Sequence, residues 1–542
     1  MVLTDNHLGM IEQLTYLNSS VASEAGISGF TSINAGQKNM TISKILNCFD
    51  EKALATLESK GDTSIEYVSA KEWAGIIRYL KSSEMKDLVL TDTMKDSEGT
   101  TLALCFSEDN NSNEAIVAFR GTTKGEWGDN IEGLNVADTP CQLEAREYIK
   151  SLPYDNITVT GHSKGANKAM YVAVTSDKVT RCVAYDGQGV SQEFIDKYGP
   201  KIINKADTIT AYSVSTDYVH ALLFPIPGSK QVYCQGFGIA NTGEHHSPNS
   251  FFMTDENGNI VVDDKGNPTI IETDEDESIK MLHEFTTFVV NNASDEEKKK
   301  ITGYLCPLIA KVFSGEKLEV QEMINDCLAD TDTLALIIAY LVKYMDVQNL
   351  SAEDVDKLLT TIGLSNLDDL FTLKVGDFSI VGLSGLIDFT KGQLTDNDDD
   401  KIITFILSKI EIDGLDIDSF WRKIDSNVKN IDASKGCGDA KVIGAFDGFI
   451  ANAYVTMHPY IRANTAALRG YADRLVKVNR RLCALDRKMD SLYLKVGLRD
   501  LFNLLQADLL TGSSGRISNC AKYLEETAND FDHTERNVVE QF

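Results

Sequence analysis

The feature that most constrains this chain is the segment Gly-His-Ser-Lys-Gly at positions 161–165. It follows the run 157–160, which has the pattern of a short buried strand, and it precedes residues 166–174, which have the pattern of a helix. A serine with glycine two positions to either side, between a strand and a helix, is typical of a nucleophile elbow. The alternative is an ordinary glycine-bounded turn that contains a serine by chance.

The elbow conformation explains why these residue types are needed. The turn is sharp and strained, so a side chain at Gly161 or Gly165 would clash with its neighbours. The reactive hydroxyl of Ser163 would then stand above the edge of a sheet. The backbone N–H of Lys164 would lie beside it at a helix N-terminus, a position that suits an oxyanion.

The pattern of the chain changes along its length. Between about residues 87 and 270 strands and helices alternate, which predicts a mainly parallel sheet with helices on both faces. The expected strands are 88–93, 101–106, 115–119, 157–160, 179–185 and 208–214, and the expected helices include 70–80, 141–152 and 192–198. An acidic segment at 272–277 ends this part, and the periodicity beyond it is helical. We therefore expect an α/β domain at 1–275 and a helical middle region at 279–435.

A long antiparallel helical hairpin is expected at 440–542. Apolar residues keep a spacing of three and four from Ile461 to Leu492, and the spacing resumes after the glycine- and serine-rich turn 512–515. The first arm is basic and the second acidic, so the arms suit each other or a helical partner.

Charge and cysteine content exclude several classes of protein. The net charge of −29 argues against binding to nucleic acid and against adsorption to anionic membranes. The ten cysteines lack the spacing of a metal site, so we expect buried free thiols in a reducing compartment. Residues 395–400 resemble half of a calcium loop, but Lys401 replaces the glycine that such a loop needs. No metal is therefore expected. The N-terminus lacks the pattern of a secretory signal, and no apolar run is long enough to span a membrane.

A serine nucleophile needs a base and an acid that orients the base. The strand 208–214 leads to Asp217, two strands after the elbow, and places its carboxyl at the sheet edge. Among the histidines that follow the serine, one lies too close to Asp217 and three lie beyond the acidic segment or near the C-terminus. His245 and His246 remain as candidate bases. Asp186 is the alternative acid, although it comes one strand earlier and could simply form a turn with Gly187.

The sequence resembles class 3 lipases at four separated motifs that occur in order over residues 60–270. They are the strand and turn 117–122 with its Arg-Gly-Thr end, Trp127 with Asp129, the elbow followed by Asn167, and the His-Ser-x-x-Ser motif at 246–250. The elbow and histidine motifs are closest to a lipase-like bacterial branch of that group. Lys164 and Ala166 replace the leucine and glycine common in fungal members, so details of the acyl groove do not carry over.

The resemblance implies an α/β-hydrolase fold and specific roles for the candidate residues. Ser163 would be the nucleophile, Asp217 the acid and His246 the base, with Thr122 and Lys164 as oxyanion-hole donors. His245 is the alternative base. Such an enzyme needs neither a metal nor an organic cofactor.

The C-terminal hairpin resembles helical hairpins that address proteins to bacterial type VII secretion. Leu510-Thr511-Gly512 matches a Leu-x-Gly turn, and residues 531–535 loosely match the aromatic and acidic signal of such hairpins. Those hairpins usually stand at the N-terminus of toxins, so the C-terminal position is a departure. A dimerising hairpin is the alternative.

These observations predict an α/β-hydrolase domain followed by an all-α region. We expect a serine hydrolase that cleaves acyl esters of lipids, as a lipase or phospholipase A, and that is exported as a toxin without a cleavable signal. The expected partners are the lipid or ester substrate, small helical proteins that bind the hairpin, and an inhibitor protein. The alternatives are a soluble carboxylesterase or thioesterase, and a non-catalytic interaction or membrane-disrupting protein that acts through residues 279–542. A cytoplasmic location is the alternative to export.

Overall fold

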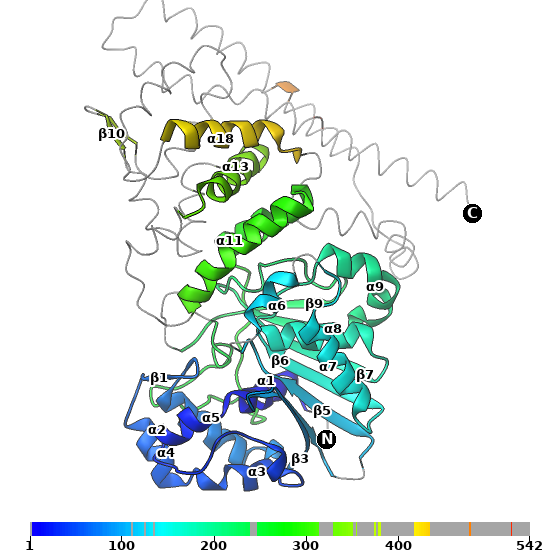
Figure 1. Ribbon diagram of the computed structural model, residues 1–542. Coiled ribbons are helices and arrows are strands. Elements are labelled where there is room, and N and C mark those ends of the chain that lie inside the picture. Colours follow the sequence, from blue (N-terminus) through cyan, green and yellow to red (C-terminus); the bar gives the residue numbers. More distant parts are fainter. Residues whose placement is uncertain are drawn as a thin grey trace, which may run out of the picture. The chain divides into compact units, whose positions relative to one another are not determined.

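A computed structural model describes the N-terminal part of the chain almost completely (Figure 1). The described residues are 3–109, 112–123, 126–133, 136–238, 246–313, 329–348, 350, 354, 373–375, 378–380, 417–433, 476–477 and 522. Contacts divide the chain into one unit at 1–447 and a second at 448–542. The segment 395–400 and all of the expected hairpin except residues 476–477 and 522 lie outside the described residues, and the domain boundaries stay a prediction.

One seven-stranded sheet forms the centre of the first unit. Its strands occur in chain order: β3 (Val89–Lys95), β4 (Thr101–Ser107), β5 (Glu114–Phe119), β6 (Asn156–His162), β7 (Val179–Tyr185), β8 (Ile209–Val214) and β9 (Lys230–Cys234). The first three strands pair antiparallel, and β5 to β9 pair parallel. This mixed sheet with its helices confirms the predicted α/β fold.

Side-chain alternation along β7 shows that helices cover both faces of the sheet. Val183 and Tyr185 belong to the apolar cluster that includes α1 (Asp5–Glu12) and α5 (Ala70–Ser82). Cys182 and Ala184 point to the opposite face, where α8 (Lys164–Thr175) packs on the central strands between α7 (Pro140–Ser151) and α9 (Gln192–Lys205). Figure 1 shows these helices on the two sides of the sheet. Because β5 to β9 run parallel, their carboxyl ends lie along the same edge of the sheet, where a site can form.

The remaining α-helices and strands of the α/β part are short. They are α2 (Ser19–Glu24), α3 (Ile42–Ile45), α4 (Glu51–Glu58), β1 (Ser64–Ile65), β2 (Val68–Ser69) and α6 (Trp127–Glu132). Isolated antiparallel bridges join Thr254 to Ile260 and Val262 to Pro268. These bridges enclose two tight turns with glycine at positive φ.

Two elements differ from the sequence prediction. Strand β9 was not predicted. Helix α9 continues past Tyr198 to Lys205 even though it contains Pro200. Proline at this position removes only one backbone donor, so burial of Ile202 against the domain outweighs the lost hydrogen bond.

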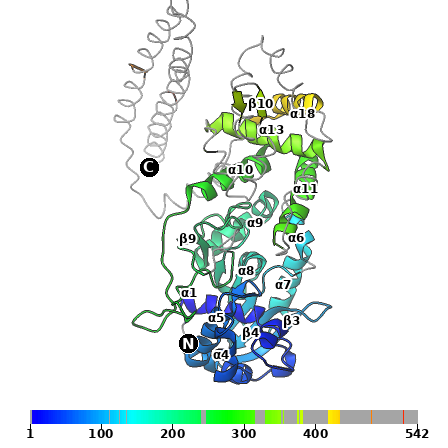
Figure 2. The same ribbon diagram turned by 90° about the vertical axis from the view of Figure 1, so that its left-hand side faces the viewer.

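The helical region begins directly after the acidic segment (Figure 2). Its described helices are α10 (Glu277–Asn292), α11 (Asp295–Phe313), α13 (Thr331–Gln348) and α18 (Ile417–Asn430). A short hairpin of β10 (Leu373–Val375) and β11 (Phe378–Ile380) departs from the all-α structure that the sequence predicts for this region. Asp276 caps α10 by accepting a hydrogen bond from the Ser278 N–H at 2.8 Å. Apolar side chains of α10, α11, α13 and α18 form a cluster of their own. Among the described helices, none combines the length and apolar character needed to cross a membrane.

Candidate active site

The elbow places Ser163 in a backbone conformation that is unusual for serine. Ser163 has φ 58° and ψ −126°, between the last residue of β6 and the first of α8. A Cβ atom on Gly165 would lie 2.2 Å from the carbonyl oxygen of Phe119, and one on Gly161 would lie 2.5 Å from the carbonyl carbon of Gly165. Only glycine therefore allows this close approach between strand and helix. The strain of about 1–3 kcal/mol is typical of a functional turn.

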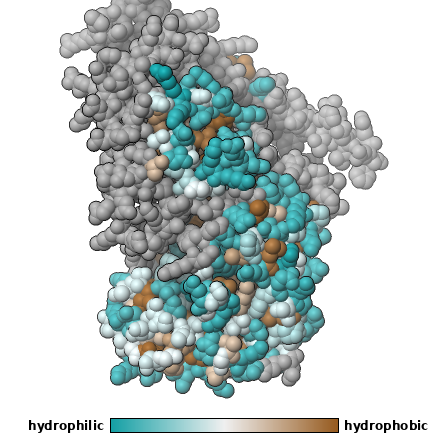
Figure 3. Space-filling view, viewed as in Figure 1, coloured by the Kyte–Doolittle hydropathy of each residue, from teal (hydrophilic) through white to brown (hydrophobic). Residues whose placement is uncertain are grey.

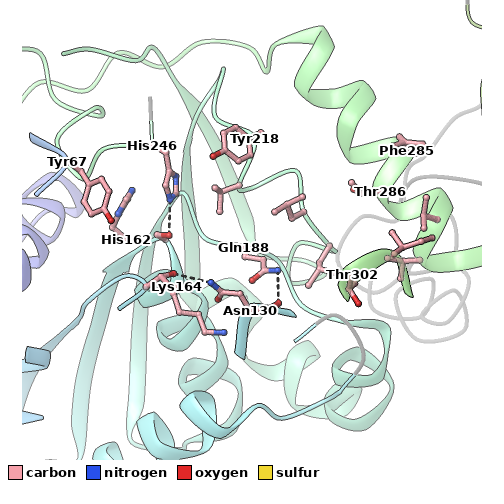
Figure 4. A pocket seen from close by; sticks show the side chains of 18 of the residues that line it. Tyr67, Asn130, His162, Lys164, Gln188, Tyr218, His246, Phe285, Thr286 and Thr302 are labelled. Carbon is pink, nitrogen blue, oxygen red and sulfur yellow. Dashed lines mark hydrogen bonds between the residues drawn. The ribbon is translucent and has the colours of Figure 1, made fainter. Parts of the chain in front are cut away.

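Three of the predicted site residues form one row of hydrogen bonds. The His246 Nε2 atom lies 2.8 Å from the Ser163 hydroxyl (Figure 4). Its Nδ1 atom lies 2.6 Å from an Asp217 carboxyl oxygen. Asp217 is fully buried, whereas the His246 side chain is 14% exposed. A histidine placed in this way can take a proton from the hydroxyl while the carboxylate stabilises the resulting charge. His245 lies outside the described residues.

The acid of the row is one of two neighbouring buried carboxyls. Burial alone would raise the pKa of Asp217, but the facing His246, together with His220 and the Val219 N–H, lowers it to about 2. Burial, reinforced by the Asp217 charge, raises the pKa of Asp186 well above its ordinary value. Asp186 also accepts a hydrogen bond from the Val214 N–H at 2.8 Å. The alternative acid is thus a neutral neighbour of Asp217.

A buried polar group behind the elbow comes from a part of the chain that sequence analysis missed. The Tyr16 hydroxyl accepts a hydrogen bond from the Gly121 N–H at 3.1 Å and lies 3.0 Å from Nδ1 of His162. Burial, and secondarily the nearby His246, lowers the pKa of His162 well below its ordinary value, so its ring is neutral. The His162 ring packs 4.7 Å from that of His246. Tyr16 precedes the alternating region, and no motif points to it.

The loop that carries His246 is held by its own side chains and by the N-terminal helices. Ser247 and Ser250 bond each other within a tight turn. Asn249 accepts a hydrogen bond from Gln13 at 3.3 Å and donates one to Glu72 at 2.9 Å. These contacts fix the histidine loop to helix α5 and to the residue that directly follows α1, and they give the His-Ser-x-x-Ser motif a structural role.

Thr122 and Lys164, the predicted oxyanion-hole residues, both line the cavity at Ser163. The Thr122 hydroxyl accepts a hydrogen bond from the Asn130 side chain at 3.1 Å. The buried ammonium of Lys164 pairs at 2.5 Å with Asp129, which also accepts hydrogen bonds from the Thr139 hydroxyl and the Cys141 N–H. This ion pair explains why lysine can replace an apolar residue here. Sequence analysis missed Asn130.

Asn167 lies two residues after the elbow and belongs to the predicted motif. Its side chain joins helix α8 to the loop that follows β7. Its amide donates to the carbonyl oxygens of Gln188 and Gly189 at 3.1 and 3.0 Å, and its oxygen accepts from Gln142 at 2.9 Å. Nearby, Lys168 forms a buried ion pair with Glu126. Asn167 therefore supports the elbow and does not line the cavity.

A cavity of ≈ 220 Å³ opens above Ser163 and His246. Its lining is mostly apolar and includes side chains of α10, α11 and α13; Figure 4 shows Phe285, Thr286 and Thr302 on the side opposite His246 and Lys164. A mostly apolar cavity with a few polar groups at one end suits an amphipathic ligand.

One group of side chains in the described part of the chain could hold a metal ion. Ligand atoms of His162, Asp186 and His246 all lie within 4.8 Å of one another. Both ring nitrogens of His246 already make hydrogen bonds, to Ser163 and to Asp217, so a metal ion would have to break that row. The donor set fits hydrogen bonding better than metal binding.

Comparison with known proteins gives one match. Residues 67–229 match the family model of the Tle-like phospholipase domain. This region is therefore lipase- or phospholipase-like, and it contains the elbow and Asp217. No curated protein matches the chain. The match ends before His246, and the finer resemblances to class 3 lipases and to type VII hairpins stay predictions.

Proposed function

We propose that this chain is a serine hydrolase that cleaves acyl esters of lipids, as a lipase or phospholipase A, through an acyl-serine intermediate. The observation that carries the proposal is the pair of hydrogen bonds that His246 makes to Ser163 and Asp217, 2.8 and 2.6 Å long. The match to a phospholipase domain supports the substrate class. The apolar cavity above the serine supports it independently.

The proposed reaction follows from the position of each group. His246 takes the proton of the Ser163 hydroxyl as the oxygen attacks the ester carbonyl, and the ionised Asp217 stabilises the resulting imidazolium. The backbone N–H of Lys164 and the hydroxyl of Thr122 stabilise the oxyanion. His246 then protonates the departing alcohol. Water, activated by the same histidine, hydrolyses the acyl-serine and releases the fatty acid.

Thr122 can donate its own proton in this scheme. Its oxygen accepts the hydrogen bond from Asn130, so the hydroxyl hydrogen stays available for an oxyanion. Asn130 would thus orient the donor without touching the substrate oxygen.

A lipid panel tests the proposal. Wild type and Ser163→Ala would be incubated with phospholipids, triacylglycerols and short soluble esters, and the products identified by mass spectrometry. We expect fatty acid and lysolipid from wild type alone. Turnover of short esters without any rise at aggregated lipid would favour the soluble carboxylesterase or thioesterase. No serine-dependent product from any ester would contradict the proposal and favour a non-catalytic protein.

We also propose export through a type VII-like system, with residues 440–542 as the address. The support is the sequence pattern alone, namely the Leu-Thr-Gly turn at 510–512 between two heptad-patterned arms. Residues 440–542 should co-purify with small helical proteins, and a chain ending at residue 440 should stay inside the producing cell. Normal export of the shortened chain would contradict the address.

A further inference from the structure

The cavity above the proposed nucleophile is closed by helices that lie outside the phospholipase-like region. The matched region ends at residue 229, whereas Phe285, Val289, Ile301 and Ile337 line the cavity from α10, α11 and α13. Two threonines of the same helices, Thr286 and Thr302, also line the cavity, but their hydroxyls donate to backbone carbonyl oxygens. The wall therefore offers an acyl chain mainly apolar contacts.

The helices are anchored to the loop that carries the triad acid. The Thr286 hydroxyl donates to the Ala221 carbonyl oxygen at 2.8 Å, and His283 Nδ1 lies 3.3 Å from the same oxygen. Ala221 is buried in the apolar cluster of the helical region, and Tyr218 packs against it. The wall and Asp217 thus share one short loop.

Helix α10 carries one apolar face that is only partly covered. Phe288 is fully buried in the cluster that α10 forms with the other helices. Phe285 and Val289, on the same face of the helix, pack against the edge of that cluster, are only half-buried and line the cavity. The parts of Phe285 and Val289 that the cluster leaves uncovered are therefore available to a ligand.

The distribution of polarity gives the ligand a direction. Lys164 and His246 line the cavity beside Ser163, and Figure 4 shows Phe285 of α10 on the opposite side. On the face drawn in Figure 3, the hydrophobic surface of the described residues is broken into small separate areas. The cavity is therefore where a long apolar chain finds mainly apolar contact.

We propose that α10, α11 and α13 form the binding wall for a long acyl chain, so that this helical region sets the chain-length preference. This inference rests on the proposed ester hydrolase function. An ester bound with its carbonyl at Ser163 would extend its acyl chain along Val289 toward Ile337. Each further methylene that the wall covers is removed from water, so long chains gain most from the wall.

The test fills the cavity at one position. Val289→Trp places a large side chain against the bound acyl chain. Val347→Trp is the matched control, because Val347 lies on α13, is 44% exposed and does not line the cavity. kcat/KM would be measured for soluble esters from acetyl to dodecanoyl. The ratio of dodecanoyl to acetyl kcat/KM should fall by about tenfold or more in Val289→Trp and stay at the wild-type value in the control. An unchanged ratio in Val289→Trp would overturn the inference.

A binding measurement separates this inference from the proposed function. A fluorescent long-chain fatty acid would be titrated into Ser163→Ala protein with and without Val289→Trp. We expect Val289→Trp to weaken binding by about tenfold or more, and Val347→Trp to leave it unchanged. If wild type cleaves no ester but fatty-acid binding depends on Val289, the proposed function is wrong and the acyl-binding role of the helices is supported. If esters are cleaved but Val289→Trp leaves fatty-acid binding unchanged, the acyl-binding role is wrong and the proposed function is supported.

Discussion

The carboxyl groups of Asp186 and Asp217 are buried neighbours whose pKa values are shifted in opposite directions. Burial and the neighbouring charge raise the pKa of Asp186, while His246 overcomes the effect of burial and lowers that of Asp217 to about 2. Asp217 is therefore ionised throughout the physiological range, and Asp186 stays neutral beside it. A negative charge is thus concentrated on the carboxyl that faces the histidine.

This pair predicts how stability depends on pH. Because the pKa of Asp186 is higher in the folded state, the folded protein keeps this proton at a pH where the unfolded chain has lost it. The free energy of unfolding therefore falls as the pH rises above the unfolded pKa of about 3.8. Asp186→Asn removes that loss and keeps the acceptor for the Val214 N–H. The stability of Asp186→Asn relative to wild type should grow as the pH rises above 4, with a slope of at most about 1.4 kcal/mol per pH unit. Thermal unfolding across that range checks this.

The control for this prediction is Asp207→Asn, at an exposed position outside the site. Its stability relative to wild type should be nearly independent of pH. A flat profile for Asp186→Asn as well would show that Asp186 is not held neutral. Asp217 acts in the opposite sense, because its lowered pKa contributes stability above about pH 4 that is lost as the pH falls toward 2.

Tyr16 links the N-terminal helices to the elbow, so its hydroxyl should matter for stability. Tyr16→Phe leaves the buried Gly121 N–H without its acceptor, which should cost about 1–3 kcal/mol of unfolding free energy. Tyr79→Phe is the control, because the Tyr79 hydroxyl bonds to Gly266 at an exposed site and should contribute less than about 0.5 kcal/mol. Urea unfolding of both variants checks this. Equal costs would rule out a special role for Tyr16.

The buried ion pair of Lys164 and Asp129 gives a third prediction. Asp129→Ala leaves the ammonium buried and unpaired, which should destabilise the fold by about 3–5 kcal/mol. Adding Lys164→Met removes that charge and should recover part of the loss. The free energy of unfolding of the two single variants and the double variant checks this. Additive losses would mean that the pair contributes no coupling.

The oxyanion hole gives a prediction about the rate. Thr122→Val keeps the shape of the side chain and removes the hydroxyl, so kcat should fall on the order of 10²-fold. The control is Thr123→Val, because the adjacent Thr123 does not line the cavity. Steady-state kinetics on one soluble ester would separate the effects. A change in KM alone for Thr122→Val would mean that the hydroxyl binds the ground state and not the oxyanion.

The sequence predicts the α/β region well because its signals are local. Strand β7 has the predicted bounds, since its apolar run ends sharply at the Asp-Gly of residues 186–187. The elbow was recognisable because glycine is required two positions on either side of Ser163. Helix α9 was predicted too short, because Pro200 suggests an end that tertiary packing overrides.

Residues that reach the site from distant parts of the chain could not be predicted. Tyr16 lies 146 positions before His162, and no periodicity connects them. Asn130 follows a motif but lies on the short helix α6, which the buried pair of Asp129 and Lys164 joins to helix α8. The apolar residues of α10 have the same sequence pattern whether they face a core or a cavity. Only the packing of the neighbouring helices determines which of them face the cavity.

Covalent labelling tests the central claim most directly. Wild type, Ser163→Ala, His246→Ala and His245→Ala would be treated with a fluorophosphonate and followed by intact-protein mass. We predict one adduct on wild type that maps to Ser163, none on Ser163→Ala, and labelling slowed by roughly 10³-fold or more in His246→Ala. His245→Ala should label like wild type. Undiminished labelling of Ser163→Ala, with all four proteins folded, would contradict the account.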